Sequence, residues 1–566
     1  MPPSLPLRPL FKHRMWVLFV LFTVCMAILF AIAWFGRLPT NTGKPSSYQV
    51  ATVVDNGDKT SVNDTGSTQV ATELPPDEPS PRFKQLGAQT LAEGIANLVS
   101  NNPNKTGIYP LNNGMDAFAA RMLLISTAEK TLDLQYYILN NDITGNLMLQ
   151  GIKEAAERGV RVRLLLDDNN TRGLDPTLWV LNDHANIEVR LMNPNRYRSW
   201  RWLGFVGDFD RLNHRMHNKS LTADSQLTIT GGRNIGDEYF ALNQDMVFSD
   251  MDVLMVGAIV PQVSQDFDRY WNHPLAYPIT DLIEKPKQSN LDQVFIPKAQ
   301  QKDKPASDHL DPMLKLKNAY LERIVALDFV NKVKRQHLPM YWATTELLSD
   351  NPDKLLGKPS DKSYEIGQSL GDTKHHARIV SAYFVPTQAG TDYFVKLAKA
   401  GADVRILTNA MSATDVKAVH SGYAKYRQQL LTGGVKLYEL KPNAKRDQQH
   451  NSYLTGRSAT SLHAKTFESD GERLYIGSYN FDPRSAELNT ELGVNIHSPE
   501  MATHMQQNFD RSIATDAYTV TLVDDKVQWH SLENGKPTVY HEEPQTKAWE
   551  RSLVWLLAKL PIEWLL

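Results

Sequence analysis

Cysteine is almost absent from the sequence. Of the 566 residues, Cys25 is the single cysteine, and it lies within an apolar run near the N-terminus. Disulfide bonds and cysteine-based metal sites are therefore excluded from the remaining chain. This composition suits an oxidising compartment, although a cytosolic protein can also lack cysteine.

A surplus of charge of one sign is also missing. The chain contains 61 basic and 63 acidic residues, for a formal net charge of −2. Proteins that bind nucleic acid through its phosphate backbone usually present a basic surface, so this balance argues against nucleic acid as a partner. The contents of 42% hydrophobic and 22% charged residues are those of a globular protein, and the length allows two or three domains.

An uncharged run of about 20 residues extends from Trp16 to Phe35, which is sufficient for a helix to cross a bilayer core of ~30 Å. Three basic residues precede the run and two follow it, which places the N-terminus in the cytoplasm by the positive-inside rule. The competing interpretation is a cleaved signal peptide, but no small-x-small cleavage site follows closely. We therefore predict an uncleaved single-pass anchor, with the rest of the chain outside the cytoplasm.

Residues 38–82 are rich in Asn, Thr, Ser, Asp and Gly and show no hydrophobic period. Such a segment is a flexible tether. Strand-like and helix-like runs begin to alternate at about residue 115. The predicted organisation is a cytoplasmic N-terminus (1–14), an anchor (15–36), a linker (37–84), a first half (85–284), a connecting segment (285–370), a second half (371–515) and a C-terminal segment with an amphipathic tail (516–566).

The two halves follow one plan. Buried-type strands alternate with amphipathic helices in each, and Gly159–Leu165 is visibly related to Gly401–Leu407. This alternation predicts an α/β fold in which each half is a mixed β-sheet flanked by helices. We expect the two similar, duplicated halves to pack around one active site between them. The expected strands are 131–138, 160–166 and 187–192 in the first half and 379–384, 404–408 and 435–440 in the second.

A motif occurs once in each half. The first copy runs from His217 to Asn234 and the second from His463 to Asn480. Both read H-x-K, four residues, D, six residues, G-[GS]-x-N, and an acidic residue follows each histidine by 28 positions. Chance would produce such a match about once in a million starting positions for each copy. The matching residues are His217, Lys219, Asp224, Asn234 and Asp245 in the first copy and His463, Lys465, Asp470, Asn480 and Glu491 in the second.

The residue types point to chemistry at phosphorus. Histidine can attack phosphorus or transfer a proton near neutral pH, and lysine and the asparagine amide can hold phosphoryl oxygens. Displacement at phosphorus requires a nucleophile on one side and a general acid at the leaving oxygen on the other. We therefore expect the two copies to face each other, with Lys219, Asn234, Lys465 and Asn480 binding the phosphate. Which histidine is the nucleophile stays open.

The acidic residues of the motif have different expected roles. Asp224 and Asp470 lie beyond a short strand, so we interpret them as turn or scaffold residues. Asp245 and Glu491 are expected on a neighbouring strand, where they would accept the histidine N–H and fix its tautomer. No cluster with metal-ligand spacing is visible, and the adjacent His375 and His376 are interpreted as loop residues. We expect no metal and no cofactor.

The duplicated motif resembles the HKD signature of the phospholipase D superfamily, and further segments resemble the bacterial cardiolipin synthases. These segments are Leu164–Asn170, Gly231–Tyr239, Tyr383–Pro386 and Gly477–Arg484, within a likeness that covers roughly residues 105–566. The resemblance implies a metal-independent phosphatidyl transferase of the bacterial inner membrane with a covalent phosphohistidine. It implies phosphatidylglycerol and a second phospholipid, such as phosphatidylethanolamine, as substrates. It also assigns catalysis to the His, Lys and Asp of both copies.

Two alternatives remain beside a transferase. A phospholipase D-type hydrolase, or more remotely a nuclease, would use the same site with water as the acceptor. A non-catalytic membrane scaffold would keep the duplicated fold, although neither motif has lost a member. The oligomeric state and any need for a protein partner stay open.

Segments outside the repeat offer contacts with lipid. Residues 195–205 mix three arginines with four aromatics, as in a surface loop with cation–π contacts or a rim that engages phospholipid headgroups. The tail Trp549–Leu566 has three tryptophans among aliphatic and charged residues, so it is expected at the membrane interface or docked on the catalytic region. Tyr383 is a candidate substrate contact. The connecting segment shows one helical run, 313–333.

Overall fold

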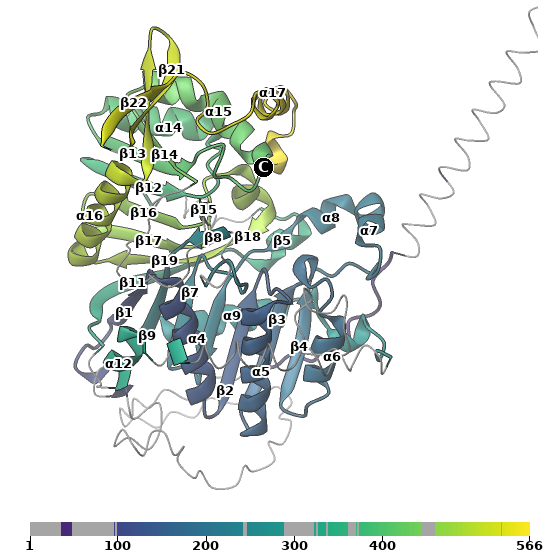
Figure 1. Ribbon diagram of the computed structural model, residues 1–566. Coiled ribbons are helices and arrows are strands. Elements are labelled where there is room, and N and C mark those ends of the chain that lie inside the picture. Colours follow the sequence, from purple (N-terminus) through teal and green to yellow (C-terminus); the bar gives the residue numbers. More distant parts are fainter. Residues whose placement is uncertain are drawn as a thin grey trace, which may run out of the picture.

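The computed structural model describes residues 36–47, 99–240, 246–287, 338–359, 373–442, 459–533 and 535–566, with 26, 95–96, 322–323, 326–334 and 369–370 as short additions (Figure 1). The predicted anchor, apart from Met26 and Gly36, and most of the predicted linker lie outside these residues. Within the described ranges, no helix has the length and apolar character needed to cross a membrane.

The first half is a mixed sheet with the strand order β10, β4, β3, β2, β6, β7, β9, β1. β2, β3 and β4 are parallel to one another, and the other pairs are antiparallel. The strands are β1 (Thr106–Leu111), β2 (Thr131–Tyr136), β3 (Arg161–Asp167), β4 (Ile187–Met192), β6 (Ser220–Ala223), β7 (Leu227–Gly231), β9 (Asp252–Gly257) and β10 (Ala276–Pro278). The longer helices are α4 (Gly114–Thr127), α5 (Ile143–Glu157), α6 (Asp175–Asn182) and α9 (Val260–Trp271).

The second half repeats this order as β20, β14, β13, β12, β16, β17, β19, which confirms the duplication predicted from the sequence. The strands are β12 (His376–Ser381), β13 (Asp403–Asn409), β14 (Lys436–Leu440), β16 (Lys465–Ser469), β17 (Arg473–Gly477), β19 (Leu492–His497) and β20 (Ala517–Val523), followed by the hairpin β21 (Lys526–Glu533) and β22 (Lys536–Tyr540). The helices are α14 (Thr387–Lys399), α15 (Lys417–Thr432), α16 (Pro499–Thr515) and α17 (Ala548–Leu557).

The local chemistry explains these elements. β3 is buried from Val162 to Asp167, as expected for a parallel strand covered on both faces. α5 begins after Asp142, whose carboxylate accepts the backbone N–H of Gly145 and so satisfies one of the free donors of the first turn. Gly159 and Gly401 follow α5 and α14 with φ of 97° and 103°, a backbone conformation that glycine adopts without steric cost.

A strand of the connecting segment joins the two sheets. β11 (Tyr341–Ser349) pairs antiparallel with β1 on one side and with β19 on the other. Figure 1 shows β11 between the blue first half and the green second half. The predicted helical run 313–333 lies partly outside the described residues, and its described end contributes to α12 (Asp328–Lys334).

The halves also pack face to face through a shared apolar core. Val253 and Met255 of β9 lie in one buried cluster with Ile476 of β17 and Val494 of β19. α9 and α16 add buried side chains to the same cluster. Because burial of apolar surface drives this association, the core fixes how the two motifs sit relative to each other.

Candidate active site

Each motif histidine lies at a place where a short strand from one half runs beside a short strand from the other. β5 (Arg215–Met216) directly precedes His217 and pairs in parallel with β18 (Asn489–Thr490). β15 (Ala459–Leu462) directly precedes His463 and pairs in parallel with β8 (Met246–Ser249). In both cases the residue that follows the partner strand is acidic, so the backbone pairing sets a carboxylate beside each imidazole.

These carboxylates cross between the halves. His217 Nδ1 lies 2.8 Å from Glu491 Oε2, and His463 Nδ1 lies 2.6 Å from Asp250 Oδ2. Both histidines and both carboxylates are buried. A carboxylate at Nδ1 holds the ring proton there, so that Nε2 of the neutral imidazole carries a lone pair. Each of these two pairs thus takes its histidine from one half and its carboxylate from the other.

The expectation that Asp245 is the counterpart of Glu491 is wrong. Gly231 pairs with Asp252 and Gly477 pairs with Gly493 in the two sheets, so Asp250 occupies the position that Glu491 occupies. Asp250 lies 33 residues after His217, whereas Glu491 lies 28 residues after His463. The first half therefore contains five more residues after the motif, and Asp245 lies outside the described residues.

The lysines lie beside the histidines. Lys219 Nζ donates to the carbonyl of His217 at 2.6 Å, and Lys465 Nζ donates to the carbonyl of His463 and lies 2.8 Å from its Nδ1. Both side chains are buried. H-x-K spacing accounts for this arrangement, because residues two apart share a face of an extended chain.

Tyrosine rings and amides enclose the pair. The ring of Tyr137 meets His217 edge to face at 4.9 Å between centroids, and that of Tyr239 meets His463 at 5.2 Å. Asn234 Nδ2 donates to the Tyr239 hydroxyl at 3.0 Å, and Asn234 Oδ1 accepts the N–H of Ile138 at 3.2 Å. These contacts fix the asparagine at the end of β2. Phosphate binding by its amide remains a proposal.

The equivalent position in the second half is similar. Asn480 Oδ1 lies 3.5 Å from the backbone nitrogen of Tyr383, whose hydroxyl donates to Asp415 at 2.8 Å. Tyr383 follows β12 as Ile138 follows β2, so it lies at the same edge of its sheet as the motif. Its role as a substrate contact stays a prediction.

Asp224 and Asp470 hold the other end of the motif. Asp224 accepts three backbone N–H groups, from Glu129, Lys130 and Thr131, at 2.7–2.9 Å. Asp470 accepts the equivalent three, from residues 374–376, at 2.8–2.9 Å. Both aspartates have positive φ, 52° and 56°, and follow β6 and β16. This geometry is that of scaffold residues, and it places His375 and His376 in the loop that Asp470 binds.

The two histidines and the two lysines of the site all have lowered pKa values. Burial, together with Lys219 and Lys465, holds the pKa of His217 well below its usual range. Burial and Lys465 also lower the pKa of His463, and Asp250 opposes them. Burial lowers the pKa of Lys219 to about 7 and that of Lys465 in the same direction. A bound phosphodiester anion would reverse these shifts, because an opposite charge nearby favours each protonated form.

The two carboxylates differ in protonation. Burial disfavours the Asp250 anion, but the His463 imidazole and Lys465 outweigh burial and hold the pKa of Asp250 well below its usual range. Burial raises the pKa of Glu491 to about 7, against the pull of Lys219. At neutral pH Asp250 is therefore a full anion beside His463, whereas Glu491 is partly protonated beside His217.

Several residues that support the site carry no signal in the motif. Ser478 Oγ donates to Glu491 Oε2 at 2.5 Å, and Asp350, which follows β11, accepts the N–H of Glu491 at 2.9 Å. The guanidinium of Arg233 donates to the carbonyl of Asp250. In the part of the chain that is described, no group of three or more His, Cys, Asp or Glu residues is arranged to hold a metal ion.

Comparison with known proteins identifies a family and several relatives. The family described as "Cardiolipin synthase, PLD-like domain" matches residues 122–271 and 366–513. Cardiolipin synthase C of Escherichia coli (strain K12) is 43% identical over 481 residues, which is 84% of this chain and 99% of the relative. An uncharacterised protein of Helicobacter pylori (strain ATCC 700392 / 26695) is 32% identical over 78% of this chain and 86% of the relative.

Among solved structures, phosphatidylserine synthase of Haemophilus influenzae Rd KW20 matches with a TM-score of 0.51. The match covers 83% of this chain and 99% of that one, at 13% sequence identity. At this identity the likeness concerns the fold alone.

Proposed function

The chain belongs to the PLD-like family of cardiolipin synthases, and we propose on that premise that it is a phosphatidyl transferase that makes cardiolipin from phosphatidylglycerol and a second phospholipid. The observation that supports this most strongly is the pair of buried histidines, each held by a carboxylate from the opposite half. Such a pair suits displacement at phosphorus with a covalent intermediate, and neither motif has lost a member.

The first step is attack on the donor phosphodiester. Nε2 of one histidine forms a bond to phosphorus while the bond from phosphorus to the headgroup oxygen breaks. The other histidine, in its protonated form, gives its proton to that leaving oxygen. Lys219 and Lys465 stabilise the charge on the phosphoryl oxygens, as a metal ion does in other enzymes. The products are a phosphatidyl-histidine and the free headgroup alcohol.

The second step runs in reverse with a new alcohol. The histidine that gave its proton now removes one from a hydroxyl of the acceptor headgroup glycerol. The acceptor oxygen bonds to phosphorus as the bond to the histidine nitrogen breaks. One phosphodiester is consumed and one is formed, so the transfer requires no nucleotide donor. With water as the acceptor the product would be phosphatidic acid, which is the hydrolase outcome.

We assign His217 as the nucleophile and His463 as the general acid and base. A nucleophile must be unprotonated, and Glu491, which holds His217, is itself partly protonated at neutral pH. The general acid must carry a proton, and the Asp250 anion 2.6 Å from His463 stabilises the imidazolium. The unequal carboxylates thus divide the two roles.

Location follows from the predicted anchor. With an uncleaved helix over Trp16–Phe35 and a cytoplasmic N-terminus, the catalytic halves would lie in the periplasm of a two-membrane bacterium. The periplasm lacks ATP, and a transfer between two phosphodiesters needs no such energy source. A reporter fused after Leu566 that is active only outside the cytoplasm tests this orientation. Activity of a cytoplasm-only reporter at the same position would reverse it.

The function itself is tested with purified full-length protein and labelled phosphatidylglycerol. Labelled cardiolipin, absent with a His463→Ala variant, is the expected product. Phosphatidic acid as the sole labelled product would establish a hydrolase instead. A second labelled phospholipid, phosphatidylethanolamine, added in parallel identifies which lipid is the donor and which is the acceptor.

A further inference from the structure

Exposed tryptophan is concentrated in two segments far apart in the sequence. Trp200 and Trp202 lie at the start of α7 (Arg201–Gly207), and Trp549, Trp555 and Trp564 lie in or after α17. Between 50% and 67% of the surface of each is exposed. Every tryptophan that is exposed in the described part of the chain belongs to one of these two segments. A soluble protein exposes few such side chains together, so a contiguous patch marks an interaction surface.

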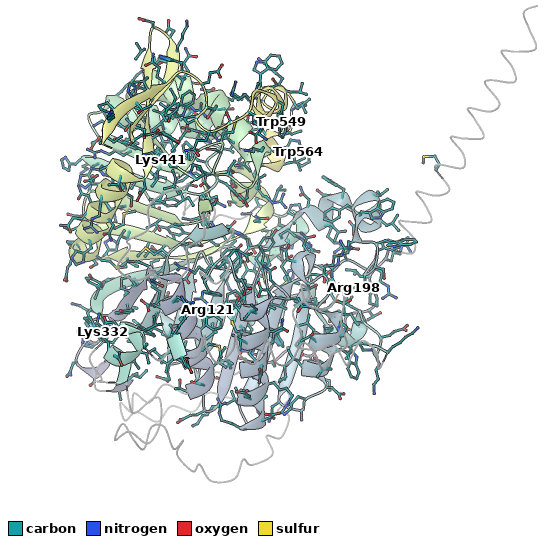
Figure 2. The ribbon with its side chains drawn as sticks, viewed as in Figure 1. Arg121, Arg198, Lys332, Lys441, Trp549 and Trp564 are labelled. Carbon is teal, nitrogen blue, oxygen red and sulfur yellow. The ribbon has the colours of Figure 1, made fainter. Side chains whose placement is uncertain are left out.

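The two segments meet in space. The ring of Phe209, on α8 (Phe209–Asn213), contacts Trp564 edge to face at 6.4 Å between centroids, and 46% of Phe209 is exposed. Figure 2 shows Trp549 and Trp564 on the side of the second half that lies nearest to α7 and α8. We call these exposed aromatic residues, Trp200, Trp202, Phe209, Trp549, Trp555 and Trp564, the aromatic face.

The aromatic face is fastened to the catalytic site. Arg484 donates to the side chain and the carbonyl of Asn213, the last residue of α8, at 3.0 and 2.8 Å. The backbone N–H of Arg484 donates to the carbonyl of Leu566 at 2.8 Å. Asn213 lies four residues before His217, and Arg484 lies four residues after Asn480. Both parts of the face are thus attached directly beside the two motifs.

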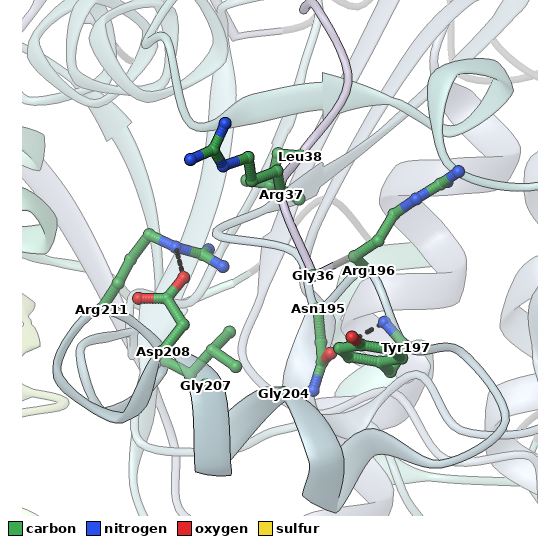
Figure 3. A pocket seen from close by; sticks show the side chains of 11 residues that line it. Gly36, Arg37, Leu38, Asn195, Arg196, Tyr197, Gly204, Gly207, Asp208 and Arg211 are labelled. Atoms are coloured by element: carbon green, nitrogen blue, oxygen red, sulfur yellow. Dashed lines mark hydrogen bonds and ion pairs between the residues drawn. The ribbon is translucent and has the colours of Figure 1, made fainter. Parts of the chain in front are cut away.

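The chain that follows the predicted anchor lies against the same surface. Gly36, Arg37 and Leu38 line a pocket of about 210 Å³ with Arg196 and Gly204 of the α7 segment (Figure 3). Gly36 directly follows Phe35, where the predicted membrane span ends. The aromatic face therefore lies at the point where the chain would leave a bilayer.

The polar residues of this surface suit an anionic lipid interface. Arg37, Arg196 and Lys559 are exposed, and Lys559 Nζ lies 5.7 Å from the centre of the Trp555 ring. Tryptophan with lysine and arginine at its border is the composition of segments that lie at the headgroup level of a membrane. Basic side chains there are attracted to anionic phospholipid.

We propose that the aromatic face docks on an anionic phospholipid bilayer and presents the catalytic site to the lipid headgroups. The face would act in addition to the predicted anchor, which by itself attaches the chain to the bilayer at one point. The choice of lipid as the occupant rests on the proposed function. A protein partner or a second copy of the chain is the competing occupant.

The single native cysteine makes the test direct. Full-length Cys25→Ser protein with Trp202→Cys, Trp555→Cys or Leu532→Cys is labelled with an environment-sensitive dye and incorporated into vesicles of phosphatidylglycerol and phosphatidylethanolamine. Leu532 is the control, because it is 60% exposed on β21, outside the aromatic face. Doxyl-labelled lipids should quench the dye at positions 202 and 555 but not at 532. Equal quenching at all three, or a blue shift at 202 and 555 that doxyl-lipids do not quench, would overturn the proposal.

An activity measurement separates docking from chemistry. Trp202→Glu with Trp555→Glu should lower transfer on vesicles about tenfold, since it removes apolar contact with the interface. The same variant should keep its rate with a water-soluble short-chain phosphatidylglycerol, and Leu532→Glu should match the wild type on both substrates. An equal loss on both substrates would overturn the docking role. Failure of the wild type to form cardiolipin would overturn the proposed function and leave the quenching result to decide docking.

Discussion

Replacement of Asp250 by asparagine removes the charge that stabilises protonated His463. Asparagine keeps the size of the side chain and can still accept the N–H of Met251, which Asp250 Oδ1 accepts at 2.8 Å. The lost interaction is a buried hydrogen bond between charged groups, worth about 1.5–3 kcal/mol. Since about 1.4 kcal/mol corresponds to a factor of ten in rate, kcat for cardiolipin formation should fall roughly 10- to 100-fold.

The pH profile of this variant distinguishes a catalytic effect from a structural one. Asp250 opposes the burial and the Lys465 charge that lower the pKa of His463, so its removal lowers that pKa further. A general acid acts only while protonated, and the alkaline fall in rate should therefore move to lower pH. Initial rates with labelled phosphatidylglycerol between pH 5 and 9, with the unfolding midpoint as a control of folding, measure this shift.

Glu491→Gln is the matched control. Glu491 is partly protonated near pH 7 because burial raises its pKa to about 7, so a neutral amide there should cost less than tenfold in rate, given a neutral hydrogen bond worth about 1 kcal/mol. The division of roles would be refuted if Glu491→Gln cost as much as Asp250→Asn. An unchanged pH profile in Asp250→Asn would refute the pairing argument itself.

Other changes separate scaffold from chemistry. Asp224→Ala or Asp470→Ala leaves three backbone donors without their carboxylate. Each variant should lose about 1–3 kcal/mol of unfolding free energy and several degrees of unfolding midpoint, while the folded protein keeps its KM. An unchanged melting curve would contradict the scaffold role. Dialysis against EDTA should leave the rate unchanged, because Lys219 and Lys465 supply the positive charge at the phosphoryl oxygens; loss of activity that one divalent ion restores would contradict this. Lys465→Met should lower kcat about 100-fold or more, since one such electrostatic contact contributes about 3 kcal/mol, and near-normal turnover would remove Lys465 from the site.

The pairing of motifs was predictable because chemistry fixes their residues. Histidine and lysine must share one face of an extended segment, and H-x-K spacing follows directly from strand geometry. The duplicated α/β plan was predictable from periodicity, since buried parallel strands leave near-continuous apolar runs such as Val162–Leu166, which only Arg163 interrupts. The scaffold role of Asp224 and Asp470 followed from their position beyond the strand.

The cross-half carboxylates were not predictable from one half read against the other. Matching the two acidic residues by equal spacing from their histidines assumes loops of equal length in both halves. Loops tolerate insertions, however, because the entropy cost of closing a loop rises slowly with its length. The five extra residues before Asp250 broke the register, and only strand pairing reveals that Asp250 and Glu491 are equivalent. The role of β11 was also hidden, because it is a single strand without a repeat partner in the motif pattern, placed by contacts with β1 and β19.

The most direct test of the account uses a phosphatidyl ester of p-nitrophenol as the donor. This leaving group is acidic enough to depart without a general acid, so the first step depends on the nucleophile alone. With this donor, His463→Ala should release a burst of about one nitrophenolate per enzyme and then stall as a phosphatidyl-His217 adduct, which peptide mass spectrometry detects. His217→Ala should show no burst. A burst with His217→Ala, or the absence of an adduct in a His463→Ala enzyme that still turns over, would contradict the two-histidine mechanism proposed for this site.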